Sequence, residues 1–203
     1  MTIKRGEEWG IAGALPDEGL LVRSDAEARQ AVERNRRVGL PVPPLGLLGG
    51  DLCHTLGGTG DEARLRSPEA RQVPVDLGAA LIDGKLHWFV AHVVVRRSWW
   101  SGRIVAVMNA EFLGDWDVAP RSHPNDGRLD TFDAQLSLGD RLKARKRLPT
   151  GSHVPHPGIE QRRVDAVQFE FPSATPIWLD GEALGTVRRL SVRVEADALT
   201  CVV

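Results

Sequence analysis

The stretch WLDGEALG, Trp178 to Gly185, decides how the C-terminal part of the chain folds. An Asp-Gly pair between apolar residues is the strongest short-range signal for a β-hairpin, because a tight hairpin turn needs positive φ at its central residues and glycine adopts it freely. Glu182 follows directly, so the turn presents two carboxylates, Asp180 and Glu182, on a rigid corner. Two interpretations stay open: a plain turn with solvated carboxylates, or the edge of an active site in which a carboxylate serves as a base.

The composition is that of a folded protein. The 203 residues are 42% hydrophobic and 26% charged, and the length suffices for one good core or two small ones. A net charge of −1 gives no electrostatic reason to expect nucleic acid as a partner. Cys53 and Cys201 lack metal-ligand spacing, which favours buried roles in a reducing compartment. The sequence shows no signal peptide and no membrane-spanning stretch, so we expect a cytoplasmic protein, at most peripheral to a membrane.

Residues 1–60 carry the pattern of a β-α-β-α segment. Ser24 is a natural N-cap, Glu27 completes a capping box with it, and Gly39 is placed to close the same helix. A short apolar strand precedes this helix and another follows it. Asp51 is then expected to cap a second, short helix.

The pattern of apolar and polar residues changes near Val73. Short alternating or β-branched runs, separated by turn signals about every ten residues, are typical of an antiparallel sandwich or barrel. One of these turns is the Asp-Gly pair at Asp83 and Gly84. We therefore predict an α+β fold, in which residues 61–72 connect the small β-α-β-α segment to a mainly antiparallel β-sandwich over residues 73–203.

Six motifs follow one another over most of the chain from Leu20 onward. They are LLVRSDAEARQAV, PLGLLGGDLCHTLGG, VPVDLGAAL, VMNAEFLGDWDVAPRSHPNDGRLD, GSHVPHPGIEQRRVDAVQFEF and IWLDGEAL. None is specific alone, but their order resembles the diacylglycerol kinase family of lipid kinases, which includes the sphingosine kinases and bacterial relatives and is distantly similar to NAD kinase. The resemblance implies that residues 73–203 form the β-sandwich domain of that family.

The resemblance also implies candidate catalytic residues. Glu182 is the counterpart of the glutamate that takes the proton from the lipid hydroxyl, Asp180 is its neighbour in a carboxylate network, and Asp126 is the counterpart of an aspartate at a magnesium site. An active enzyme would use these residues together with Asp25, ATP and magnesium. Phosphoryl transfer requires mainly positioning, charge neutralisation and a well-placed base. From the residues alone, Asp126 is equally well explained as a turn former.

The chain departs from the family at its phosphate loop. In the family, a glycine-rich GGDGT loop lets backbone N–H groups approach the nucleotide phosphates at a helix N-terminus. Here the same place contains Arg23, Ser24, Asp25 and Glu27, and only the aspartate of the motif is retained. Glu27 adds a negative charge in the first helical turn, which favours the helix and repels a phosphate.

A second phosphate-contacting motif is reduced as well. The chain runs directly from Leu48 to Gly49, Gly50 and Asp51, where anion binding through free N–H groups and a plain helix cap are both compatible with the residues. Only 19 residues precede Leu20, so we expect an incomplete nucleotide domain. Together with Ser24, these positions form a degenerate nucleotide site that should bind ATP weakly or not at all.

A Trp-Trp pair between two predicted strands is a candidate contact surface. Arg96 and Arg97 flank Trp99 and Trp100, a combination that suits a lipid surface or a partner protein, since indole favours the interface and guanidinium binds phosphate. The alternative is that one indole folds back onto the edge of the sandwich. The basic run from Arg141 to Leu148 fits either one solvated face of a short helix or contact with anionic lipid.

The sequence thus leaves three functions open. The first is a pseudokinase that has kept a lipid- or partner-binding sandwich. The second is an active lipid kinase that uses ATP and magnesium with Glu182 as base, in which a homo-oligomer supplies the missing wall of the site. The third is an interaction protein that docks a full-length kinase or another subunit through Trp99 and Trp100.

Overall fold

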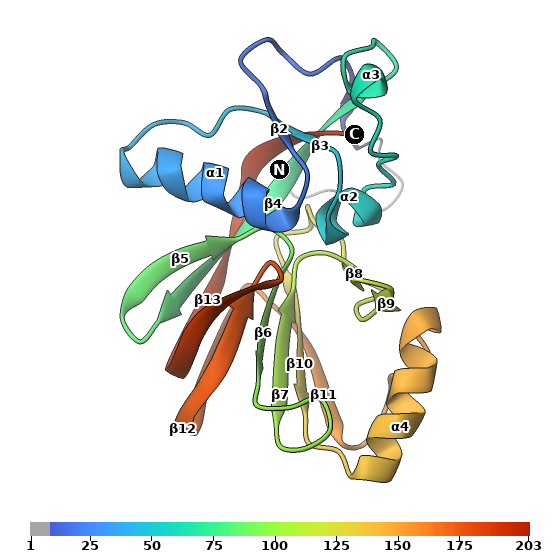
Figure 1. The fold of residues 1–203 in the computed structure, drawn as a ribbon, viewed down its shortest axis with the longest axis vertical. Helices are drawn as coiled ribbons and strands as arrows, with labels where there is room; N and C mark the ends of the chain where they lie inside the picture. Colours follow the sequence, from blue (N-terminus) through green and yellow to red (C-terminus); the bar gives the residue numbers. More distant parts are fainter. Residues whose placement is uncertain (1–8) are drawn as a thin grey trace.

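The computed structural model describes residues 9–203, and its elements are labelled in Figure 1. The strands in this part are β1 (Ile11–Ala12), β2 (Leu20–Val22), β3 (Leu45–Leu47), β4 (Arg71–Ile82), β5 (Lys85–Phe89), β6 (His92–Arg96), β7 (Ile104–Met108), β8 (Phe112–Leu113), β9 (Trp116–Asp117), β10 (Leu129–Ala134), β11 (Ile159–Val164), β12 (Ala166–Leu179) and β13 (Glu182–Val202). The helices are α1 (Asp25–Arg37), α2 (Asp51–Thr55), α3 (Glu62–Leu65), α4 (Leu138–Arg147) and the 3₁₀ helix η1 (Leu148–Thr150).

One long sheet organises the molecule. Its main path runs in the order β1-β4-β13-β12-β6-β7-β10-β11, while β5 pairs with β4, β3 with β13 and β2 with β3. β13 has 21 residues and pairs antiparallel with β12 and β4 before it pairs in parallel with β3 near the C-terminus. This single strand therefore connects the mainly antiparallel part to the small parallel part that carries α1, α2 and α3 (Figure 1).

The alternation along the strands sorts side chains between a core and a functional face. On β6, Val93 and Val95 belong to the apolar core of the sandwich, whereas His92, Val94 and Arg96 point to the opposite face. In the core, Gly78 on β4 lies against Phe89, and a Cβ at Gly78 would come within 2.1 Å of the ring. A glycine is therefore required where this fully buried ring crosses the strand.

The predicted β-α-β-α segment is confirmed. α1 begins after Ser24, whose hydroxyl accepts a hydrogen bond from Glu27 N at 3.2 Å, and Gly39 follows its end with a φ of +72°. β2 and β3 pair in parallel on either side of this helix in the sequence. α1 buries Ala28, Ala31 and Val32 in a second core, which it shares with α2, β3 and β4.

The prediction that Asp51 caps α2 is wrong. The helix begins at Asp51 itself, after Gly50, which has a φ of +100° and provides no side chain. The oxygens that accept from the N–H groups of Asp51 and Leu52 belong to Asp25, at 2.6 and 3.1 Å. Tertiary structure thus brings a distant carboxylate to the helix start and leaves the Asp51 carboxylate for other partners.

The two predicted Asp-Gly hairpins are confirmed. Asp83 and Gly84 have φ values of +47° and +88° between β4 and β5, and Asp180 and Gly181 have +49° and +81° between β12 and β13. The predicted fold class, a small α/β segment followed by a mainly antiparallel β-sandwich, is confirmed too. The segment predicted as a connector contains the short helix α3.

Helix α4 covers the β7 and β10 side of the sandwich (Figure 1). Most of its basic residues are exposed, but Arg141 is buried and donates to the carbonyls of Leu136, Trp99 and Gly102. Arg141 therefore fastens the helix to the segment between β6 and β7. Within residues 9–203, no helix combines the length and the apolar character that a membrane span requires.

Candidate functional site

The turn that joins β12 to β13 is anchored inside the molecule. The Asp180 carboxylate is buried and accepts hydrogen bonds from the backbone N–H groups of Val90, Ala91 and His92 at 3.0, 2.9 and 3.1 Å. The backbone N–H of Asp180 in turn donates to the His92 carbonyl at 2.9 Å. The DGE stretch is therefore both a hairpin turn and part of a polar cluster, so the two interpretations of the sequence do not exclude each other.

Glu182 faces α1. The guanidinium of Arg29, which is buried, donates through Nη2 to Glu182 Oε2, and its Nε lies 3.8 Å from Asp180 Oδ2. Gln30 Nε2 donates to the same Glu182 oxygen at 3.5 Å. Arg29 and Gln30 thus both bind Oε2 of Glu182, and the Glu182 side chain is 51% exposed.

Three ligand-type side chains meet where α1, α2 and β6 approach one another. His92 Nε2 lies 2.8 Å from Asp51 Oδ2, and one ligand atom each from Asp25, Asp51 and His92 lies within 4.8 Å of the others. Gly114 N donates to the second Asp51 oxygen at 2.9 Å. The donors would suit a divalent transition metal, but in this arrangement they bind one another and the start of α2.

Burial dominates the electrostatics of this cluster. Loss of hydration raises the pKa of Asp25, although the N–H groups of Asp51 and Leu52 oppose the shift. Burial likewise raises the pKa of Asp180 to about 7, against the opposing effect of His92. For His92, burial lowers the pKa, but its hydrogen bond to Asp51 and the nearby carboxylates outweigh burial and leave the pKa above the usual value.

The positions that resemble a phosphate loop in the sequence are closed by the chain's own side chains. Ser24 Oγ accepts from Glu27 N, and the Glu27 carboxylate accepts from Arg23 N at 2.8 Å. Asp25 accepts from the first two N–H groups of α2, and a Cβ on Gly50 would lie 2.5 Å from Asp25 Oδ1. Gly49 likewise packs closely, because a Cβ there would lie 2.7 Å from the Arg23 carbonyl oxygen.

Asp126 lies in a second acidic group with Asp76 and Asp130. Asp126 Oδ1 accepts from Arg128 N at 3.0 Å, and its Oδ2 binds the Arg163 guanidinium, whose Nε lies 3.6 Å from Asp130 Oδ2. Burial raises the pKa values of both Asp76 and Asp130 to about 6. The residues at Asp126 do not fit a magnesium ion as they stand, because a guanidinium occupies the side of the carboxylates that the cation would need.

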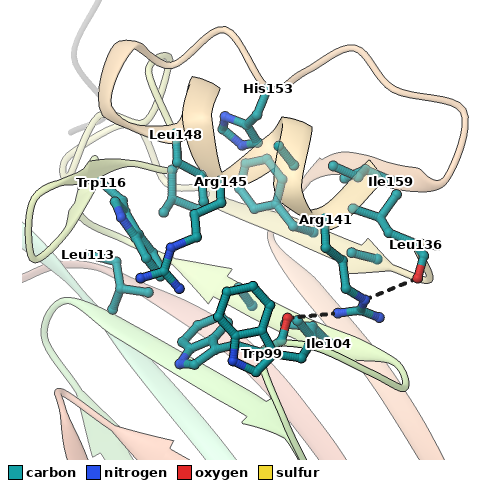
Figure 2. Close-up of a pocket in the computed structure, with 16 residues that line it drawn as sticks. Trp99, Ile104, Leu113, Trp116, Leu136, Arg141, Arg145, Leu148, His153 and Ile159 are labelled. Carbon is teal, nitrogen blue, oxygen red and sulfur yellow. Dashed lines mark hydrogen bonds between the residues drawn. The ribbon is translucent and has the colours of Figure 1, made fainter. Parts of the chain in front are cut away.

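An apolar cavity lies between α4 and the sheet (Figure 2). It has a volume of about 110 Å³. Trp99 and Trp116 form one side and meet edge to face, with centroids 5.2 Å apart. Trp100 also lines the cavity and is 48% exposed. The predicted aromatic tip therefore does two things at once: Trp99 folds back onto the sandwich, and Trp100 stays accessible.

The two arginines predicted at the tip lie in different places. Arg96 stacks between Trp99 and Trp178, with Cζ 4.1 and 4.2 Å from the ring centroids. Arg97 instead donates to Ser173 Oγ at 2.6 Å and to the Ala174 carbonyl at 3.2 Å. Arg96 therefore belongs to the aromatic surface, whereas Arg97 ties the segment after β6 to β12.

The structure brings three of the four predicted carboxylates into one region: Asp25 and Asp180 interact electrostatically, and Arg29 connects Asp180 to Glu182. Asp126 lies apart from them, in the second acidic group with Asp76 and Asp130. Sequence reasoning missed both Arg29 and His92. No spacing signal pointed to either residue, since their partners lie far away in the sequence.

The chain matches one family and several solved structures. Residues 72–203 match the family described as the YegS C-terminal NAD kinase beta sandwich-like domain. This match spans more than half of the chain, so the chain belongs to that family. No curated protein matches it. The predicted relation to the diacylglycerol kinase-like proteins, through their β-sandwich, is thereby confirmed.

The solved structures have the same fold. Two structures of a Bacillus anthracis strain Sterne protein, proposed to be a diacylglycerol kinase, are similar with a TM-score of 0.70 and 15% identity, over 91% of this chain and 77% of theirs. A diacylglycerol kinase structure from the same strain gives a TM-score of 0.64 and 16% identity, over 91% and 75%. At such identities the likeness concerns the fold.

Proposed function

We propose that this protein is a lipid-binding member of its family in which the nucleotide site is degenerate. The observation that carries the proposal is the cavity beneath α4, which is lined almost entirely by apolar and aromatic side chains and opens beside the exposed Trp100. Ligand sites for small molecules are concave and mainly apolar with a few polar groups, as this one is. Its volume of about 110 Å³ fits one chain segment better than a whole two-chain lipid.

The contacts at the phosphate loop support the loss of nucleotide binding. A helix N-terminus binds phosphate through N–H groups that have no other partner. Here Ser24, Glu27 and Asp25 already accept from N–H groups at the starts of α1 and α2, and two of these three acceptors are carboxylates. A triphosphate would have to displace them and would face their negative charge.

The surface around the cavity fits peripheral contact with a lipid layer. Leu138 and Leu142 on α4 are 59% and 48% exposed, and the exposed Trp100 contacts Arg145 of the same helix. The last turn of the same helix carries Arg145, Lys146 and Arg147. Exposed apolar residues with basic neighbours are typical of interfacial helices. We propose that this face contacts the membrane that supplies the lipid whose hydrocarbon chain enters the cavity.

A brominated monoacylglycerol tests the proposed function, because bromine quenches indole fluorescence on contact. We expect saturable quenching in the wild type, since Trp99, Trp100 and Trp116 line the cavity. Ala144→Phe should fill the cavity from α4 and abolish the quenching. Leu142→Phe, at an exposed position of the same helix, should leave it intact. Equal quenching in both variants, or none in the wild type, would reject the cavity as a lipid site.

A second candidate is an active lipid kinase, favoured by the grouping of Asp25, Asp180 and Glu182 around Arg29. The chain's own residues would position the lipid hydroxyl near Glu182, whose carboxylate would take its proton while Arg29 holds Oε2. Bound magnesium ATP would supply the phosphoryl group. The test is transfer of labelled phosphate to a lipid extract, with Glu182→Gln as control: no labelling by the wild type, or equal labelling by both proteins, rejects Glu182 as a base.

A further inference from the structure

Two arginines beside the lipid cavity are held by tryptophans and have no carboxylate partner. Arg96 Cζ lies 4.1 Å from the ring centroid of Trp99 and 4.2 Å from that of Trp178. Arg145 Cζ lies 5.1 Å from Trp100 and 5.3 Å from Trp116. In residues 9–203, neither guanidinium forms a hydrogen bond or an ion pair with the protein, and Arg96 Nε is buried without an acceptor.

Contact with the aromatic rings leaves the terminal N–H groups of these arginines available to a ligand, whereas Arg96 Nε is buried. A guanidinium binds an aromatic ring through its flat face, so its five N–H groups stay in the plane and point away from the ring. The same planar fork matches carboxylate and phosphate oxygens. Burial lowers the pKa of Arg96, in line with a positive charge that lacks a counter-charge. An anion placed against the two guanidinium groups would provide that charge.

Arg96 and Arg145 line the same groove, which has a volume of about 500 Å³, within the usual range for ligand sites. His92 and Gly181 also line it, so the groove extends to the turn that carries Asp180. The exposed Asp115 contributes one negative charge to its wall. The two arginines therefore outnumber the one aspartate, and the lining of the groove has a net positive charge even when His92 is counted as neutral.

The groove and the apolar cavity adjoin each other. Trp99, Leu113, Trp116 and Arg145 line both of them. In Figure 2 the Arg145 side chain leaves α4 and extends along Trp116 toward Leu113, and all three residues line both spaces. A ligand with its chain in the cavity would therefore present its headgroup to Arg96 and Arg145.

We propose that the groove between Arg96 and Arg145 binds the anionic headgroup, such as a phosphate monoester, of a single-chain amphiphile whose apolar part occupies the cavity under α4. This inference rests on the proposed lipid-binding function and names the charge of the ligand. The two positive charges match a phosphate monoester, which carries close to two negative charges at neutral pH.

Three probes separate the effect of the alkyl chain from that of the charge. They are octyl phosphate, octanol and methyl phosphate, each titrated against the intact protein by calorimetry at low salt. We expect octyl phosphate to bind at least about tenfold more tightly than octanol, because charge-assisted hydrogen bonds to a guanidinium are strong. Methyl phosphate should bind much more weakly than octyl phosphate. Equal affinities for octyl phosphate and octanol would refute the proposal that the headgroup is anionic. Equal affinities for the two phosphates would refute the proposal that the ligand is an amphiphile.

Substitutions assign the effect to residues. Arg96→Gln and Arg145→Gln should each weaken octyl phosphate binding about tenfold and leave octanol binding unchanged, whereas Arg96→Lys should restore part of the affinity. Asp115→Asn should strengthen octyl phosphate binding severalfold, and Arg188→Gln on the exposed part of β13 serves as the control. An unchanged preference in both glutamine variants would overturn the proposal. Failure of both octyl compounds to bind would reject the lipid function as well.

Discussion

The guanidinium of Arg29 on α1 binds the carboxylate of Glu182 at the β12–β13 turn, 153 positions further along the chain. The same guanidinium lies 3.8 Å from the buried Asp180 carboxylate. One cation thus holds both carboxylates of the DGE turn against the first helix. This contact joins the small α/β segment to the sandwich, and it occupies the side chain that is the base in the second proposed function.

We predict that Arg29→Gln lowers the free energy of unfolding by roughly 2–3 kcal/mol, because it removes the guanidinium that lies 3.8 Å from the buried Asp180 carboxylate. Glu182→Gln should lower it by less than about 1 kcal/mol, since the Glu182 side chain is 51% exposed and Arg29 keeps the nearby Asp180 carboxylate. Urea unfolding of the two single variants and the double variant measures both values and their coupling.

Arg36→Gln is the matched control on the same helix. Arg36 Nη1 pairs with Glu195 Oε2 at 3.0 Å, but the Arg36 side chain is 32% exposed. The expected loss of stability is therefore at most about 1 kcal/mol. If Arg36→Gln destabilised the protein as much as Arg29→Gln does, the special role of Arg29 would be refuted.

Asp25 is predicted to stabilise the fold as a cap of α2. Asp25→Ala removes the acceptor for the N–H groups of Asp51 and Leu52 and should cost about 1–2 kcal/mol. Amide hydrogen exchange should quicken at these two residues above all. Asp61→Ala removes a similar cap, on Ala63 N, from the short exposed helix α3 and should have a smaller effect. Unchanged exchange at Asp51 and Leu52 would show that Asp25 has another role.

Most of the fold could be predicted from the sequence because its signals are local. The cap at Ser24, the Asp-Gly turns at Asp83 and Asp180 and the alternation along the later strands each depend on residues within a few positions. The cap of α2 was assigned to the wrong residue because Asp25 lies 26 positions away from Asp51. Local chemistry indicates that an N-terminus needs an acceptor, but only the tertiary fold decides which one is supplied.

The candidate site was less predictable for the same reason. The resemblance to lipid kinases identified Asp25, Asp180 and Glu182, which the structure groups together. It could not identify Arg29 and Arg163, because the charge that each neutralises is contributed by another element. Likewise, the sequence placed Arg96 and Arg97 together at the tip, whereas Arg96 contacts tryptophans and Arg97 binds β12.

We predict that magnesium ATP at millimolar concentration does not stabilise the protein. A ligand present at a thousand times its Kd adds about 4 kcal/mol to the free energy of unfolding, which a thermal shift detects readily. Because Ser24, Asp25 and Glu27 already bind the N–H groups near both helix starts, we expect no shift. A saturable, magnesium-dependent increase in Tm would contradict the degenerate nucleotide site.

The buried acidic group around Asp130 predicts a stability that falls as pH rises. Burial raises the pKa of Asp130 from 3.8 to about 6, against the opposing charge of Arg163. A carboxyl group with a raised pKa in the folded state binds its proton more tightly there, so its contribution to stability is present below about pH 4 and disappears as pH passes 6.

Asp130→Asn should therefore stabilise the protein at pH 8, by at most roughly 3 kcal/mol, and have little effect at pH 4. Urea unfolding at the two pH values measures the difference, with Asp126→Asn as a control that loses the direct partner of Arg163. An equal effect of Asp130→Asn at both pH values would show that the Asp130 carboxyl does not titrate between them in the folded protein.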